Sequence, residues 1–219
     1  HRVDVIRTHP PYTTGTVTVT VGSTTITGAS TLWNTNNDFA EANMRVGGKF
    51  TVDNIDIYEI TAVASDTSAT LGTRYVNATG TNSTYTYFED DYALSADFLR
   101  PLDLQEFSQD LDIQLIDPMT FRRRFPRNST QGIPRAATLY AKDPTTTVAI
   151  RQRVRFNPVP NDTLLVPYSF VTNKLAVGTS GTTATALSSD ADEPIVPLEY
   201  RHAIVLHALS NWYRDKKDD

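Results

Sequence analysis

The chain has 219 residues, of which 39% are hydrophobic and 21% charged, so it can bury a real core as one large domain or two small ones. Its formal net charge of −5 argues against a protein whose main task is to grip nucleic acid, because such domains are strongly basic. The absence of cysteine excludes disulfides and thiolate chemistry, and no apolar run approaches the ~18 residues of a membrane span.

Residues 1–14 are expected to form an N-terminal stub. His1–Thr8 is short and mixed in composition, which suggests the end of a truncated helix. His9-Pro10-Pro11 then stops regular structure, because each proline restricts the residue before it to extended geometry.

Residues 15–89 are predicted to form a small β unit. Thr16–Val21 alternates strictly and is followed by Gly22-Ser23 and Thr24–Thr27, which predicts a hairpin with a two-residue turn. Further strands are expected at 49–52, 55–63, 69–71 and 84–88. Short strands separated by frequent turns indicate a small barrel or sandwich, and we expect an SH3-like barrel.

Residues 90–219 are predicted to contain a β-hairpin and helices. Asp117-Pro118 is a good helix start, because Asp caps the first turn and Pro suits its first position, so a short helix is expected from Pro118 to about Phe125. Ala136–Ala141 is expected to be a strand. Val148–Val171 alternates on both sides of a Pro-rich turn, which predicts a hairpin with one apolar face.

The C-terminal part is predicted to be a helix from Pro197 to about Lys216. Pro197 suits the first turn, and Lys216 lies near the negative end of the helix dipole. An apolar stripe marks one face, formed by Leu198, Ala203, Leu206, Leu209, Trp212 and Tyr213. The expected fold class is therefore mainly β with minor α, in which a small SH3-like barrel or sandwich is inserted in an α+β domain with a C-terminal helix.

No motif in the sequence indicates catalysis. Glu199 and His202 have the spacing of a metal-binding helix but lack a second such motif, and 190–193 is acidic without the spacing of a calcium loop. Neither a Gly-x-Ser-x-Gly nucleophile motif nor a phosphate-binding glycine loop is present. We therefore expect that the protein is not an enzyme, and we predict no catalytic residue, metal or cofactor.

Two basic clusters are the candidate interface. The first lies within Phe121–Arg127 and the second on one face of the predicted strand before Asn157; together they comprise Arg122, Arg123, Arg124, Arg127, Arg151, Arg153 and Arg155. They are expected to form salt-bridged contacts with an acidic partner subunit or, less favoured, with DNA phosphates. The alternative is a solvated face that nearby acidic residues balance. Trp212 and Tyr213 either pack on the core or anchor a neighbouring subunit.

Four stretches resemble the head-to-tail adaptor (connector) proteins of tailed bacteriophages. They are Gly15–Trp33 with Gly47–Leu71, which is similar to the small β unit of such proteins; Asp90–Leu104, with its Tyr-x-Leu-x-x-Asp-Phe step; Gly132–Ala141 leading to Arg155–Phe170; and Glu193–Tyr213, which resembles their Pro-opened C-terminal helix. They occur in the right order and span most of the chain.

The resemblance implies a structural virion protein. Copies would form a homo-oligomeric ring, of twelve subunits, beneath the portal protein and above a tail protein (nozzle or tube). The ring would continue the DNA channel, touch passing DNA only transiently and involve no membrane; it would be assembled in the host bacterial cytoplasm. The alternatives are another phage tail or baseplate protein, or a carbohydrate-binding adhesin domain. The adhesin would need exposed aromatic side chains, for which Tyr12, Trp33, Tyr85 and Tyr87 are the candidates.

Overall fold

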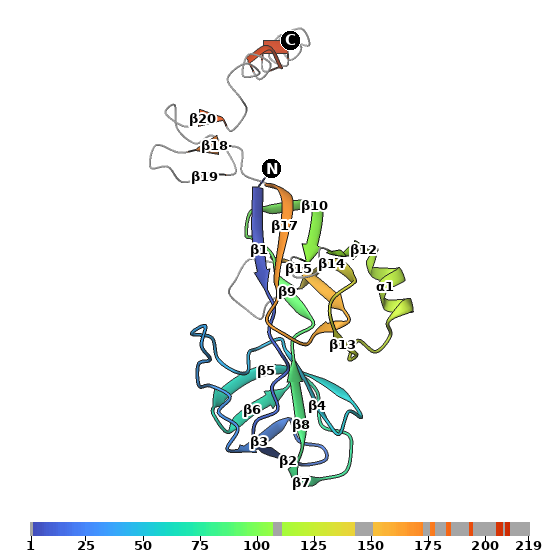
Figure 1. Cartoon of the computed structure of the whole chain (residues 1–219). Helices are drawn as coiled ribbons and strands as arrows, with labels where there is room; N and C mark the ends of the chain where they lie inside the picture. The colour runs from blue at the N-terminus through green and yellow to red at the C-terminus, as the bar shows by residue number, and fades with distance from the viewer. Residues whose placement is uncertain are drawn as a thin grey trace, which may run out of the picture. The chain divides into compact units, whose positions relative to one another are not determined.

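The computed structural model describes residues 2–106, 111–142 and 151–172, with the short stretches 176–177, 183–184, 193–194, 205–207 and 209–210. The chain divides into a larger unit, Arg2–Ala96 with Pro101–Phe170, and a smaller unit, Asp97–Arg100 with Val171–Asp219 and His1. The described chain is mainly β, as predicted (Figure 1). None of its helices is long and apolar enough to cross a membrane.

Seven strands of the larger unit form one antiparallel sheet, in the order β7-β2-β3-β6-β5-β4-β8. Their bounds are β2 Thr16–Val19, β3 Thr25–Ala29, β4 Lys49–Val52, β5 Ile57–Ser65, β6 Ser68–Leu71, β7 Gly80–Ser83 and β8 Tyr85–Phe88. The alternation predicted for the first strand is observed, because Val17 and Val19 are buried while the intervening threonine is half-buried. We call this sheet and its connecting loops the β module.

The turn between β2 and β3 differs from the predicted two-residue turn. The strands pair only as far as Thr18 and Thr27. Beyond that, the Ser23 amide donates to the carbonyl of Thr20 at 3.0 Å, and Gly22 has a φ of 80°. A positive φ at the third position of a four-residue turn favours glycine, so the turn signal was correct but its length was wrong.

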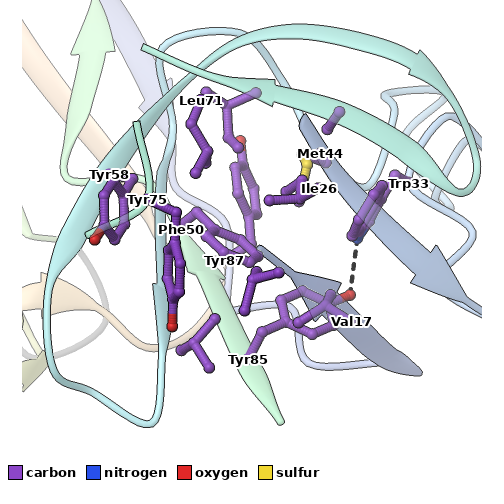
Figure 2. Close-up of a cluster of buried hydrophobic side chains, with 14 residues drawn as sticks. Val17, Ile26, Trp33, Met44, Phe50, Tyr58, Leu71, Tyr75, Tyr85 and Tyr87 are labelled. Carbon is purple, nitrogen blue, oxygen red and sulfur yellow. Dashed lines mark hydrogen bonds between the residues drawn. The ribbon is translucent and has the colours of Figure 1, made fainter. Parts of the chain in front are cut away.

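Aromatic side chains fill the core of the β module (Figure 2). Trp33 is fully buried, and its indole N–H donates to the hydroxyl of Tyr85 at 2.9 Å. The Tyr85 hydroxyl in turn donates to the carbonyl of Thr14 at 2.7 Å, and its ring stacks on Phe50. Each buried polar atom of this pair therefore has a partner, which burial in an apolar core requires.

The remaining strands of the larger unit form smaller sheets, in the orders β1-β17-β10-β11, β12-β14-β15-β9 and β13-β16. Their bounds are β1 Arg2–Arg7, β9 Asp91–Ala93, β10 Phe98–Glu106, β11 Leu111–Asp112, β12 Gln114–Leu115, β13 Gln131–Gly132, β14 Ala136–Lys142, β15 Arg151–Asn157, β16 Val159–Pro160 and β17 Leu165–Thr172. The smaller unit contains β18 Ala176–Val177, β19 Thr183–Ala184 and β20 Glu193–Pro194.

The prediction of a helical stub at the N-terminus is wrong. Arg2–Arg7 is the strand β1, which pairs antiparallel with β17 from Arg2 opposite Phe170 to Arg7 opposite Leu165 (Figure 1). Thr8 extends this pairing: its amide donates to the carbonyl of Leu164, and its hydroxyl accepts from the Leu164 amide at 2.8 Å. A partner far away in the sequence supplies the hydrogen bonds that this short segment could not supply itself.

The predicted hairpin within Val148–Val171 is also wrong, although both strands exist. β15 pairs with β14 and β9, whereas β17 pairs with β1. The chain between them contains a cis Asn157–Pro158 bond and the strand β16, which pairs in parallel with β13. Each strand buries its apolar face in a different sheet, so the shared alternation did not mean a shared ladder.

The short helix was predicted correctly. α1 runs from Pro118 to Arg124, and the side chain of Asp117 accepts hydrogen bonds from the amides of Met119 and Thr120 at 3.0 and 3.1 Å. Phe121 is buried beneath it. For the predicted C-terminal helix, residues 205–207 and 209–210 are helical, and the rest lies outside the described residues.

Candidate functional site

A groove of about 640 Å³ lies in the larger unit, which is within the range of ligand-binding pockets. Three parts of the chain form it: β4 with the start of β5, the helix α1 with the loop after it, and the strands β14 and β15. Its lining residues are Lys49, Ile55, Asp56, Ile57, Asp90, Pro118, Phe121, Arg122, Phe125, Pro126, Arg127, Asn128, Thr138, Tyr140 and Arg155. We call this site the α1 groove.

A pair of buried aspartates lies at and beside the floor of the α1 groove. Asp90 and Asp91 are each only 4% exposed. The Nε of Arg155 is 3.1 Å from Oδ2 of Asp90, and the Nε of Arg153 donates to Oδ1 of Asp91 at 2.5 Å. The Nδ2 of Asn128 donates to Oδ2 of Asp90 at 3.3 Å. The two arginines therefore neutralise two carboxylates that burial alone would make very costly.

The pKa values of these groups reflect this balance. Burial raises the pKa of Asp90, and the neighbouring Arg155 opposes that rise. Burial disfavours the charged form of Arg155, yet the attraction of Asp90 keeps the pKa of its guanidinium above the ordinary value. Burial and the charge of Asp91 raise the pKa of Tyr140, whose hydroxyl therefore keeps its proton.

Two buried oxygen atoms of groove-lining residues have no hydrogen-bond partner among the described residues. They are Oδ1 of Asp90 and Oγ1 of Thr138. Thr138, on β14, is 4% exposed. Unsatisfied buried polar atoms are few in a native protein, and each needs a water or a ligand. Both atoms are shielded from solvent, so they lie beneath the surface of the α1 groove and are not exposed to an incoming group.

The rim of the α1 groove carries free positive charge. Arg122 and Arg127 are exposed, and neither has a carboxylate partner among the described residues. The Arg127 guanidinium donates to the backbone carbonyl of Asn54 in the β module. Ile55, which is 53% exposed, and Phe125 add an apolar wall. The groove can therefore accept an anionic group and an apolar group together.

The structure brings only part of the predicted interface together. Arg122, Arg127 and Arg155 line the α1 groove. Arg123 and Arg124 are exposed on α1 but do not line it. On β15, Arg153 and Arg155 are held in internal ion pairs, so nearby acidic residues balance them, as the alternative interpretation expected. The side chain of Arg151, and Trp212 and Tyr213 altogether, lie outside the described residues.

Sequence reasoning missed Asp90, Asp91 and Thr138. The predicted boundary between residues 89 and 90 falls inside the acidic run Glu89–Asp91. The last residue of the run, Asp91, lies opposite Arg155 where β9 pairs with β15. One signal in the sequence could have indicated these aspartates. Arginines that alternate along a strand of an acidic chain are stabilised by carboxylates on the neighbouring strand. The sequence does not identify which carboxylates these are.

The aromatic side chains proposed for an adhesin site do not form an exposed surface. Trp33, Tyr85 and Tyr87 are at most 3% exposed in the core of the β module. Tyr12 packs against the same core. Among the described residues, no cluster of histidine, aspartate or glutamate side chains could hold a metal ion.

Neither family models, nor curated proteins, nor solved structures show a match to this chain.

Proposed function

We propose that this chain is a structural subunit of a tailed-phage head-to-tail adaptor. In this proposal the β module is an SH3-like barrel inserted in an α+β adaptor domain that ends in a C-terminal helix. Copies of the chain form a ring beneath the portal, above a nozzle or tube protein, and the chain acts by assembly with no catalytic step. The sequence resemblance to such adaptors supports this proposal.

The observation that carries the proposal is the composition of the α1 groove. Its rim presents Arg122 and Arg127, which have no carboxylate partner in the part of the chain that the structure describes, beside an exposed isoleucine. Arginine beside apolar side chains is typical of the centre of a protein–protein interface. The floor carboxylates are already neutralised by Arg153 and Arg155. The groove therefore has the chemistry of a docking surface.

The net charge fits the proposed location in the DNA channel. A chain with a charge of −5 presents no overall attraction to phosphates, so DNA would slide past a ring of such subunits. The location would be the virion, after assembly in the bacterial cytoplasm. The portal and tail partners would contact the two ends of the ring.

Molecular mass in solution and particle shape test the proposal. Light scattering after size-exclusion chromatography is expected to give a discrete assembly, twelve times the 24.3 kDa of the chain. Electron microscopy of the same fraction should show closed rings with a central channel. A chain that stays monomeric at micromolar concentration, alone and with the portal protein, would overturn the proposal.

A further inference from the structure

We propose that the α1 groove receives the acidic segment 190–196 of a second copy of the chain. This inference rests on the proposed function, because it assigns the contact that joins neighbouring subunits. A ring closes by a head-to-tail contact between two different surfaces of the same chain. The α1 groove is one surface, and the acidic segment is the other.

The lining of the α1 groove leaves two cations, and one exposed carboxylate, Asp56, without an ion-pair partner among the described residues. The nitrogen of Lys49 lies 2.9 Å from a carboxylate oxygen of Glu59, and Arg155 is paired with Asp90. Arg122 and Arg127 remain on the rim without a carboxylate partner among the described residues. Arginine binds carboxylates through paired N–H groups, so two rim arginines suit a segment with at least two carboxylates.

The wall of the groove adds a further requirement. Ile55 and Phe125 offer an apolar wall. The occupant should therefore be a peptide segment that carries acidic residues close to an apolar side chain.

A segment of this composition lies at 190–196, and its Glu193 and Pro194 form the edge strand β20, which pairs with β18. Residues 190–196 read Asp-Ala-Asp-Glu-Pro-Ile-Val, with three carboxylates followed by two branched apolar residues. The carboxylates of another dense acidic run, Glu89–Asp91, already form ion pairs within the chain, with Arg45, Arg155 and Arg153. Charge complementarity therefore favours the first segment as the partner of the rim arginines.

Complementary charge reversal tests this contact. The groove variant carries Arg122→Glu and Arg127→Glu, and the segment variant carries Asp190→Lys and Asp192→Lys. The control carries Arg123→Glu and Arg135→Glu, which reverse the same number of charges at exposed arginines that do not line the groove. Circular dichroism confirms the fold of each variant, and sedimentation measures self-association.

Each reversed variant alone is expected to self-associate about tenfold more weakly or worse, and the control to associate like the native chain. Mixing the two reversed variants should restore association, because each groove then meets a segment of opposite charge. If both variants assemble normally, or if the mixture stays dissociated, the docking inference fails while the adaptor proposal stands. A native chain that stays monomeric at micromolar concentration, both alone and with the portal protein, overturns both.

Discussion

Removing the positive charge of Arg155 should expose how strongly Asp90 depends on it. Arg155→Gln keeps a polar side chain but leaves the carboxylate of Asp90, 4% exposed, without its cation. Breaking a buried ion pair costs about 3–5 kcal/mol. The Arg155 side chain is 32% exposed, so water screens the pair and we expect the lower end, about 3 kcal/mol of unfolding free energy.

The loss should depend on pH in a defined direction. Burial raises the pKa of Asp90 above that of the unfolded chain, and Arg155 limits the rise. A group whose pKa is higher in the folded than in the unfolded state stabilises the fold at pH values below its pKa in the unfolded state. This stabilisation is lost as the pH rises through its pKa in the folded state. Without Arg155 the pKa of Asp90 rises further. The loss of unfolding free energy in Arg155→Gln should therefore be largest at about pH 8 and smaller at about pH 5. Because one proton is involved, the loss should change by at most about 1.4 kcal/mol per pH unit.

Urea denaturation followed by tryptophan and tyrosine fluorescence measures both effects, as the difference between variant and native chain at each pH. Arg123→Gln is the control, because Arg123 is exposed on α1 and should change stability by less than about 0.5 kcal/mol. Adding Asp90→Asn to Arg155→Gln should abolish the pH dependence of the difference. A penalty under about 1 kcal/mol at pH 8, or one that does not change with pH, would refute the role assigned to this pair.

Three further substitutions test local features of the fold. Tyr85→Phe leaves the buried indole N–H of Trp33 without its acceptor, so we expect a loss of about 1–3 kcal/mol in chemical denaturation; a loss within error contradicts the bond. Gly48→Ala places a methyl group in steric conflict with the ring of Tyr87, so the melting temperature should fall, and an unchanged value would show that the ring moves freely. Asp117→Ala removes the cap of α1 and should lower stability more than Asp117→Asn does. Because hydrogen bonding lowers the pKa of Asp117, the advantage that the ionised carboxylate gives the native chain over Asp117→Asn should be present above the unfolded pKa and lost as pH falls through the folded pKa; thermal melts of both chains at each pH decide.

Local signals predicted most strands of the β module and α1, because their causes are local, but they did not predict β9 or the nine-residue strand β10. β4 has the predicted bounds, since its short β-forming stretch lies between turn residues. α1 begins at the predicted Asp-Pro cap. β7 was missed because Gly80–Ser83 carries no apolar residue; it is a strand because β2 offers it a pairing edge.

Pairing between distant segments was not predictable from the same signals. β15 and β17 both alternate and lie close in sequence. Nevertheless, β15 pairs with β14 and β9, whereas β17 pairs with β1. Alternation states which side chains are buried but not which strand lies alongside. The candidate site illustrates the same limit of local signals. The basic clusters in the sequence identified the arginines. The buried aspartates that pair with Arg153 and Arg155 could not be identified, because their position depends on the pairing of β9 with β15.

The path of the chain into and out of the β module has an engineering consequence. The module lies in sequence between β1 and β9, and its two ends are joined by an antiparallel bridge in which Tyr12 and Tyr87 exchange backbone hydrogen bonds of 2.8 and 2.9 Å. Because these ends already meet, a short linker could replace everything between them at little cost in loop-closure entropy. The module can thus be excised as a unit while the ladder of β1 with β17 keeps its register, but excision removes Ile55 from the wall of the α1 groove and Glu41 from its ion pair with Arg7.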